Sequence, residues 1–204
     1  MERYKFQGKT PEEALEKALY ELKLEKKDII YRTEEIAVGG LFKTKKQELT
    51  VISLNEALND AKKFLTDLIT AMGIEVKMEC KKREGIINIE LHSDENPVLI
   101  GKNGKTLDAL QILVRQALNT KSGMFINVTV DVEGYKQKQI DRLERDIRRI
   151  AKDVIRSKVE VKLDPMNSYE RRIVHTIVSE FNNLETESIG EDPNRCTVIK
   201  YSEK

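Results

Sequence analysis

The sequence predicts an α+β chain built from three small modules. Its apolar residues switch repeatedly between the two-residue period of strands and the 3.6-residue period of helices. Aromatic residues make up 5% of the 204 residues, Trp is absent and charged residues make up 35%, so several modest cores fit better than one large core. A long helical pattern separates the last module from the rest. The expected boundaries are 1–53, 54–133 and 134–204.

The first module has the order β-α-β-β. A strand candidate around Phe6 precedes a helix whose start is marked by Thr10 as N-cap and Glu13 three residues later, a capping box. The strand-like segments "DIIYR" and "ELTVIS" follow, on either side of a loop that contains Gly39 and Gly40. About fifty residues are marginal for an independent core.

The second module has the order α-β-β-α-α-β. Helical spacing begins near Asn55 and ends at Gly73. The segments "IEVKMEC" and "IINIELH" alternate strictly, which predicts a hairpin with one solvated face, turned by "KKREG". A short helix with Asn96 as its N-cap, a glycine-rich loop, a helix through Leu107 and Leu118, and a strand in "FINVTVDV" complete the order.

The third module follows a helix predicted from Tyr135 to about Lys158. The segment "VEVKL" favours a strand and "DPMN" a turn. Asn167 as N-cap and Glu170 in the capping-box position then start the helix "SYERRIVHTIVSEF". Two strand candidates, "ETESI" and "RCTVIKY", end the chain.

Composition excludes several classes of protein but does not indicate what the chain binds. The net charge of +1 gives no argument for nucleic-acid binding, so any basic surface has to come from local segregation of charge. Cys80 and Cys196 lie far apart, which argues for a reducing compartment and against a disulfide framework or a zinc site. Neither a signal-peptide pattern nor a membrane-length apolar run is present. We expect a cytoplasmic protein with no membrane insertion, metal or cofactor.

The segment "VLIGKNGKTLDALQ" contains the most informative motif. A nucleotide-binding Walker loop needs G-x-x-x-x-G-K-[ST] after a strand. Gly104, Lys105 and Thr106 supply its end, but Leu99 stands where the first glycine belongs, and a short helix is expected to precede the loop. The motif therefore favours a different anion, the backbone of a nucleic acid.

Two glycines separated by two residues let a sugar-phosphate chain approach the protein backbone closely. Segment order and motif together resemble a type II KH domain, whose GXXG loop clamps about four nucleotides. The resemblance implies that Gly101 and Gly104 permit the approach while Lys102, Asn103 and Lys105 contact phosphates. Two further residues, Leu99 and Ile100, would line the groove for bases; the alternative for both is a place in the core.

A second motif, Arg171 and His175 in "RRIVH", places an arginine and an imidazole one helical turn apart, at the edge of an apolar stripe. An arginine and a histidine placed in this way can both donate hydrogen bonds to a phosphate group. The alternative is a half-buried, hydrogen-bonded histidine beside a surface arginine.

The segments "PMNSYERRIVHTIV" and "TESIGEDPNRCTVI" resemble the R3H domain as it stands at the C-terminal end of proteins of the bacterial Jag family, also called KhpB or EloR.

The Jag resemblance covers all three modules in order. It implies non-catalytic binding of RNA or single-stranded DNA in post-transcriptional regulation linked to cell elongation and division. A smaller KH-domain protein and a second copy of the chain are the partners to expect, and the N-terminal Jag domain is expected to make protein contacts. The chain departs from the family at "GGLFKTKKQE", where relatives have an "FLG" type turn, and in its short linker after the first module.

Two rival functions and one further feature stay open. An enzyme would need a complete Walker loop or a second histidine and carboxylate beside His175, and the sequence supplies neither. A protein-docking scaffold built from the same modules is not excluded. The helix from Tyr135 to about Lys158 carries many lysines and arginines interleaved with acids; these form ion pairs four residues apart or extend a phosphate track.

Overall fold

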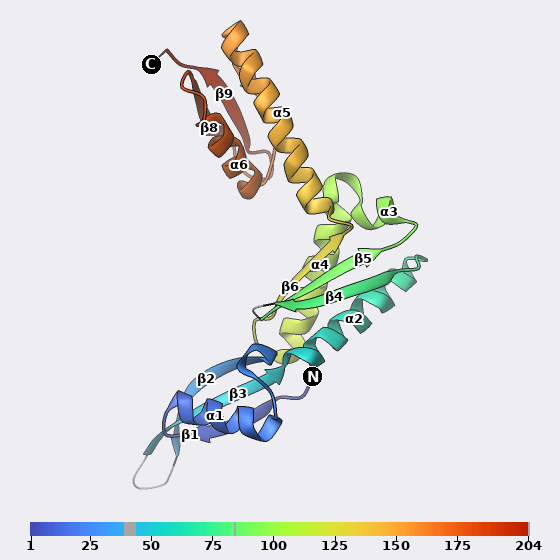
Figure 1. The fold of residues 1–204 in the computed structure, drawn as a ribbon, viewed down its shortest axis with the longest axis vertical. Coiled ribbons are helices and arrows are strands. Elements are labelled where there is room, and N and C mark those ends of the chain that lie inside the picture. The colour runs from blue at the N-terminus through green and yellow to red at the C-terminus, as the bar shows by residue number, and fades with distance from the viewer. Residues whose placement is uncertain (39–43, 84, 204) are drawn as a thin grey trace. The chain divides into compact units, whose positions relative to one another are not determined.

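In the computed structural model the chain forms two compact units, Met1–Gly134 and Tyr135–Lys204. The structure describes residues 1–38, 44–83 and 85–203. Within these ranges it contains three three-stranded sheets with their helices (Figure 1), which confirms the predicted α+β class. The expected loop at Gly39 and Gly40, part of the "GGLFKTKKQE" departure, and residue 84 of the "KKREG" turn lie outside the described residues.

The first sheet has the order β1-β3-β2 and is antiparallel throughout. Its strands are β1 (Tyr4–Gly8), β2 (Ile29–Val38) and β3 (Thr44–Ser53), and its helices are α1 (Pro11–Leu22) and the 3₁₀ turn η1 (Lys26–Asp28). Ala14 and Ala18 of α1 pack on Leu49 and Val51 of β3. Both β2 and β3 are longer than their apolar segments predict, because their polar ends pair with each other.

The start of α1 differs in detail from a capping box. The Glu13 N–H donates to Thr10 Oγ1 at 3.2 Å, as expected. The Glu13 carboxylate, however, accepts from the Lys9 N–H at 2.8 Å and not from that of Thr10. The carboxylate therefore satisfies the amide one residue before the N-cap.

The second sheet carries the GXXG segment. Its order is β4-β5-β6, with β4 (Lys77–Arg83) antiparallel and β6 (Asn127–Val132) parallel to the central β5 (Ile86–His92). The helices are α2 (Leu54–Ala71), α3 (Asn96–Ile100), the 3₁₀ turn η2 (Lys102–Gly104) and α4 (Lys105–Ser122). This is the predicted order α-β-β-α-α-β. Parallel pairing of β5 and β6 follows from the helical connection between them.

The predicted end of α2 at Gly73 is confirmed. Gly73 has φ +80°, its N–H donates to the Thr70 carbonyl at 2.9 Å, and the Ile74 N–H donates to the Ile69 carbonyl at 3.2 Å. These two bonds form a Schellman motif, which satisfies carbonyls at the end of the helix. Because Ile74 belongs to this motif, β4 begins at Lys77 rather than at the predicted start of the strand.

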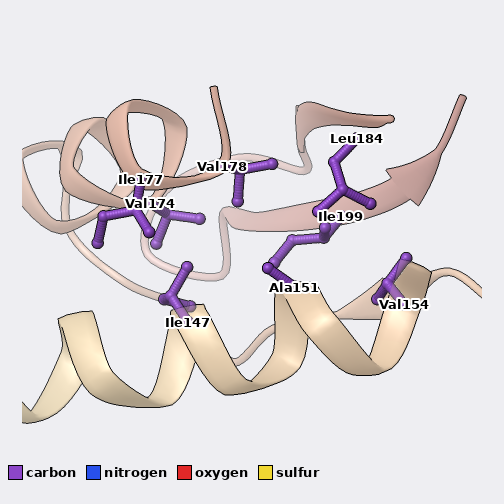
Figure 2. Packing of buried hydrophobic residues seen from close by; sticks show 8 residues of the cluster. All are labelled: Ile147, Ala151, Val154, Val174, Ile177, Val178, Leu184 and Ile199. Atoms are coloured by element: carbon purple, nitrogen blue, oxygen red, sulfur yellow. The ribbon is translucent and has the colours of Figure 1, made fainter. Parts of the chain in front are cut away.

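The C-terminal unit has the sheet order β7-β9-β8. Its elements are α5 (Tyr135–Ser157), β7 (Val161–Lys162), α6 (Ser168–Val178), β8 (Leu184–Ile189) and β9 (Cys196–Tyr201). Figure 2 shows its core, in which one face of α5 meets α6 and the sheet through Ile147, Ala151, Val154, Val174, Ile177, Val178, Leu184 and Ile199.

Two elements of this unit are shorter than predicted. The strand β7 has two residues because only Val161 and Lys162 pair with β9. Helix α6 ends three residues before Phe181, whose N–H donates to the Val178 carbonyl in a turn. The capping box is confirmed: the Glu170 N–H donates to Asn167 Oδ1 at 2.9 Å, and the Asn167 N–H donates to Glu170 Oε2 at 3.0 Å.

Candidate nucleic-acid interface

The GXXG loop has a backbone that its two glycines make possible. Gly101 has φ +70° and ψ −175°, a region essentially restricted to glycine. A Cβ added there would lie 2.1 Å from Thr106 Oγ1 and 2.8 Å from Thr106 Cβ. Asn103 (φ +54°) and Gly104 (φ +78°) are left-handed, a conformation that asparagine and glycine tolerate best. Gly101 therefore leaves room for the Thr106 side chain where the chain reverses between α3 and α4.

The loop's backbone amides are only partly occupied within the loop. The Gly101 N–H donates to the Pro97 carbonyl at 2.9 Å, and the Gly104 N–H donates to the Gly101 carbonyl at 3.4 Å. Glycines occupy the N-cap positions of η2 and α4, so neither N-cap residue has a side chain that could cap the helix start. Lys102, Asn103 and Lys105 are exposed. The Lys105 N–H also donates to the Lys102 carbonyl, and the N-cap Gly104 is buried. The start of α4, the positive end of its dipole, thus lies beside two exposed lysines, an arrangement that attracts an anion.

The two apolar residues before the loop have different environments. Leu99 is 0% exposed and belongs to the core of the N-terminal unit, so the core alternative is the correct one for this residue. Ile100 is half-buried and keeps a surface for a ligand. Of the two residues, only Ile100 can therefore contact a ligand.

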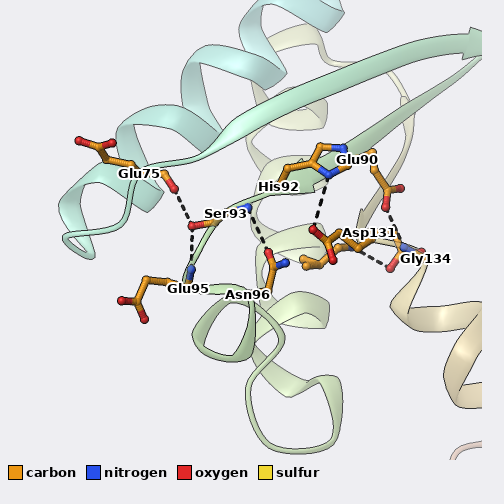
Figure 3. Close-up of polar contacts among 10 residues, drawn as sticks. Glu75, Glu90, His92, Ser93, Glu95, Asn96, Asp131 and Gly134 are labelled. Carbon is orange, nitrogen blue, oxygen red and sulfur yellow. Dashed lines mark hydrogen bonds and ion pairs between the residues drawn. The ribbon is translucent and has the colours of Figure 1, made fainter.

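A polar network fixes the chain as it enters α3 (Figure 3). Ser93 Oγ donates to the Glu75 carbonyl at 2.6 Å and accepts from the Glu95 N–H at 3.1 Å. Asn96 Oδ1 accepts from the Ser93 N–H at 3.1 Å. The predicted N-cap role of Asn96 is wrong: Glu95 occupies that position, and Asn96 instead holds the turn before the helix. The glycine loop thus follows a helix whose entry is anchored to the end of β5.

Strand β6 is one of the two edge strands of this sheet, and α3 packs against it. Two side chains of α4 bond backbone amides of β6 and of the residue before it: Gln111 Oε1 accepts from the Val130 N–H at 3.1 Å, and Asn119 Oδ1 accepts from the Ile126 N–H at 2.8 Å. Neither of these two side-chain contacts is among the expectations drawn from the sequence. Their only signal was an amide at two otherwise helical core-edge positions.

The second candidate site centres on His175, which is half-buried. Its Nδ1 is hydrogen-bonded to Thr186 Oγ1, and its Nε2 lies 3.0 Å from Ser188 Oγ. Both hydroxyls can donate or accept, so they hold the ring whichever nitrogen carries the proton. The histidine lines a cleft of about 590 Å³ together with Ser179 and Asn183. This matches the half-buried, hydrogen-bonded alternative, with one side of the ring beside an open polar cleft.

Arg171 lies deeper than expected. It is 7% exposed, whereas both readings of the sequence placed it at or near the surface. Its Nη2 is 3.7 Å from Asp192 Oδ1, a loose ion pair, and its Nε is buried without a hydrogen-bond partner among the described residues. Arg171 and His175 lie on one face of α6. Arg171 pairs with Asp192, whereas His175 is hydrogen-bonded to side chains of β8.

The described residues contain no group of His, Cys, Asp and Glu side chains placed to hold a metal ion. Cys80 and Cys196 are free thiols, and burial raises the pKa of the Cys80 thiol. None of the described helices combines the length and apolar character needed to cross a membrane.

Comparison with known proteins places both candidate sites in named domains. A family model described as the KH domain of KhpA/KhpB matches residues 59–133, and the R3H domain model matches residues 138–201. The chain is 37% identical over 196 residues to the RNA-binding protein KhpB of Clostridium symbiosum, covering 94% of this chain and 88% of that protein. It is 32% identical over 199 residues to the protein of the same name from Bacillus subtilis, covering 95% and 96%. The chain belongs to the KhpB family, as the Jag resemblance of its sequence indicates.

Proposed function

We propose that this chain binds single-stranded RNA without catalysing a reaction, and that the GXXG loop is its main contact. The observation that carries the proposal is the start of α4, where the exposed Lys102 and Lys105 flank a helix N-terminus whose N-cap is a glycine. Gly101 and Gly104 permit the approach of the backbone, Asn103 donates to phosphate, and Ile100 contacts a base. The similar proteins from C. symbiosum and B. subtilis are named RNA-binding proteins.

The R3H unit supplies a second, weaker grip on the backbone. His175 lies beside its polar cleft and reaches phosphate by exchanging one of its bonds to Thr186 or Ser188, and the buried Arg171 adds a positive charge behind it. Two weak sites on one chain raise each other's effective concentration, so the affinity of the whole exceeds that of either site. The division into a Jag domain (1–53), a KH domain (54–133) and a connecting helix with R3H (134–204) belongs to this proposal.

The Jag resemblance suggests the setting: cytoplasmic post-transcriptional regulation linked to cell elongation and division, with a smaller KH-domain protein as partner. The exposed apolar side chains of Ile112 (54%) and Leu113 (48%) on α4 support a contact with such a partner. Single-stranded DNA is the alternative nucleic acid.

A nucleotide hydrolase is disfavoured by the loop's surroundings. A helix, not a strand, precedes the loop, and the buried Leu99 occupies the position of the first Walker glycine. The proposal is tested by fluorescence anisotropy with short labelled RNAs, together with nucleotide and RNA turnover assays. We expect saturable binding that weakens with salt, and no turnover. Absence of binding at low salt, or turnover above background, would overturn it.

A further inference from the structure

Helix α5 carries a continuous row of cations that neither candidate site uses. The basic stripe consists of Lys138, Arg142, Arg145, Arg149, Lys152 and Arg156, all exposed. Their spacing alternates between four and three residues, which keeps them within an arc of roughly 80° on the helix surface. From first to last the stripe extends about 27 Å at the helical rise per residue.

The stripe lies opposite the buried face of the same helix. Ile147, Ala151 and Val154 point into the core, about half a turn away from the stripe. A charged face turned away from the core contributes little to folding, so its side chains can bind a partner without loss of the fold.

Local ion pairs account for only part of these charges. Asp146 pairs with Arg149 at 3.1 Å and Asp153 with Arg156 at 2.8 Å. Such exposed pairs are weak and are easily exchanged for a phosphate. Across the described part of the chain, no ion pair involves the other four members of the stripe, which are Lys138, Arg142, Arg145 and Lys152. The two pairs join residues three apart rather than the expected four, and they leave the first three members of the stripe and Lys152 outside any ion pair of the described residues.

The composition of the stripe selects one kind of partner. Surfaces that bind single strands combine cations with aromatic side chains on which bases stack, and the stripe has no aromatic residue. Insertion into a lipid surface needs an exposed apolar face, and that face of α5 is buried. The core of a protein interface is apolar and depleted in charge, unlike this row. A straight row of cations is complementary to a nucleic acid whose bases are paired inside and whose phosphates face the protein.

We propose that the basic stripe docks the phosphate backbone of duplex RNA. The proposal extends the proposed function, because the duplex would be a stem adjoining the single strand that the KH and R3H sites hold. Double-stranded RNA is recognised mainly through its shape and backbone, so the stripe adds affinity without sequence preference.

The test compares the wild-type chain with a variant in which the four unpaired cations become glutamine: Lys138→Gln, Arg142→Gln, Arg145→Gln and Lys152→Gln. Glutamine has nearly the same helix propensity as lysine and arginine, and circular dichroism checks the fold. The matched control removes four exposed lysine charges from the N-terminal unit: Lys9→Gln, Lys23→Gln, Lys26→Gln and Lys63→Gln. The probes are a hairpin of about 16 base pairs, the same hairpin with a tail of about eight nucleotides, and the tail alone.

For the tailed and blunt hairpins we expect the slope of log K against log salt to fall in magnitude by about 3 to 4 in the variant, one unit or slightly less per lost phosphate contact. Binding of the tail alone should be unchanged, and the control should bind like the wild type. Equal losses for tail and hairpin, or no loss for either hairpin, would overturn the inference. Binding to anionic vesicles that depends on the stripe, without binding to the hairpin, would overturn it as well. Failure of the tail alone to bind the wild type contradicts the proposed function instead, while stripe-dependent hairpin binding would still support the inference.

Discussion

Replacing the two central residues of the GXXG loop, Lys102→Asp with Asn103→Asp, should abolish most RNA binding and leave the fold intact. Both side chains are exposed, and Asn103 has φ +54°, where aspartate is tolerated nearly as well as asparagine. Replacing the glycines is a poorer test than the sequence alone suggests. A side chain at Gly101 would collide with Thr106, so lost binding would report a distorted loop.

The magnitude follows from what the loop would lose and gain. Lys102 gives up one hydrogen bond between a charged donor and a phosphate, worth about 1.5–3 kcal/mol. Each new carboxylate, at about 6 Å from a phosphate in water, adds about 0.7 kcal/mol of repulsion. The sum, about 3–4 kcal/mol, weakens binding about 100- to 1000-fold. The R3H grip remains, so binding at low salt should persist.

The assay is an anisotropy titration with a single-stranded RNA, run beside thermal unfolding. The matched control, Lys9→Asp with Asn59→Asp, makes the same change in net charge at exposed positions away from the loop. It should bind within about threefold of the wild type, and neither variant should lose more than about 0.5 kcal/mol of stability. A loop variant that binds like the control would refute the role given to the loop.

Four further outcomes follow from the structure. Gly101→Ala should weaken RNA binding in a calorimetric titration, and adding Thr106→Ala should restore only part of it because the positive φ remains; full recovery would show that the clash alone matters. Arg171→Ala should cost about 1–3 kcal/mol by removing a buried side chain, which lowers the melting temperature of the C-terminal unit by several degrees; an unchanged melting curve would contradict its burial. His175→Ala should weaken binding severalfold and uniformly across RNA sequences, and a sequence-selective loss would argue against a backbone contact. Burial raises the pKa of Asp60, but hydrogen bonds from Lys121 and the Met1 amino group outweigh this and hold the pKa below its usual range. Its stabilising effect is therefore present above about pH 4 and is lost as the pH falls through the lowered pKa, so Asp60→Asn should reduce acid sensitivity in urea unfolding.

Features set by neighbours in the sequence could be predicted well. The capping box of Asn167 and Glu170, the end of α2 at Gly73 and the GXXG turn each depend on fewer than ten consecutive residues. The order of elements also follows from local periodicity, because the apolar spacing changes clearly between strand and helix.

Features set by distant residues could not be predicted. The length of β7 depends on pairing with β9, and the lengths of β2 and β3 depend on each other. The burial of Arg171 depends on the loop that carries Asp192. Helical spacing alone placed Arg171 at the edge of the apolar face of α6. The role of Gln111 on the edge strand required knowing which strand lies beside α4.

The account depends most on the loop between α3 and α4 as the contact for RNA, and nuclear magnetic resonance tests this directly. Titration of the isotope-labelled chain with a short single-stranded RNA should shift the amide signals of residues 100–105 most strongly within the KH unit. Loop signals that stay unchanged at saturation, with shifts confined to other surfaces, would contradict the central claim.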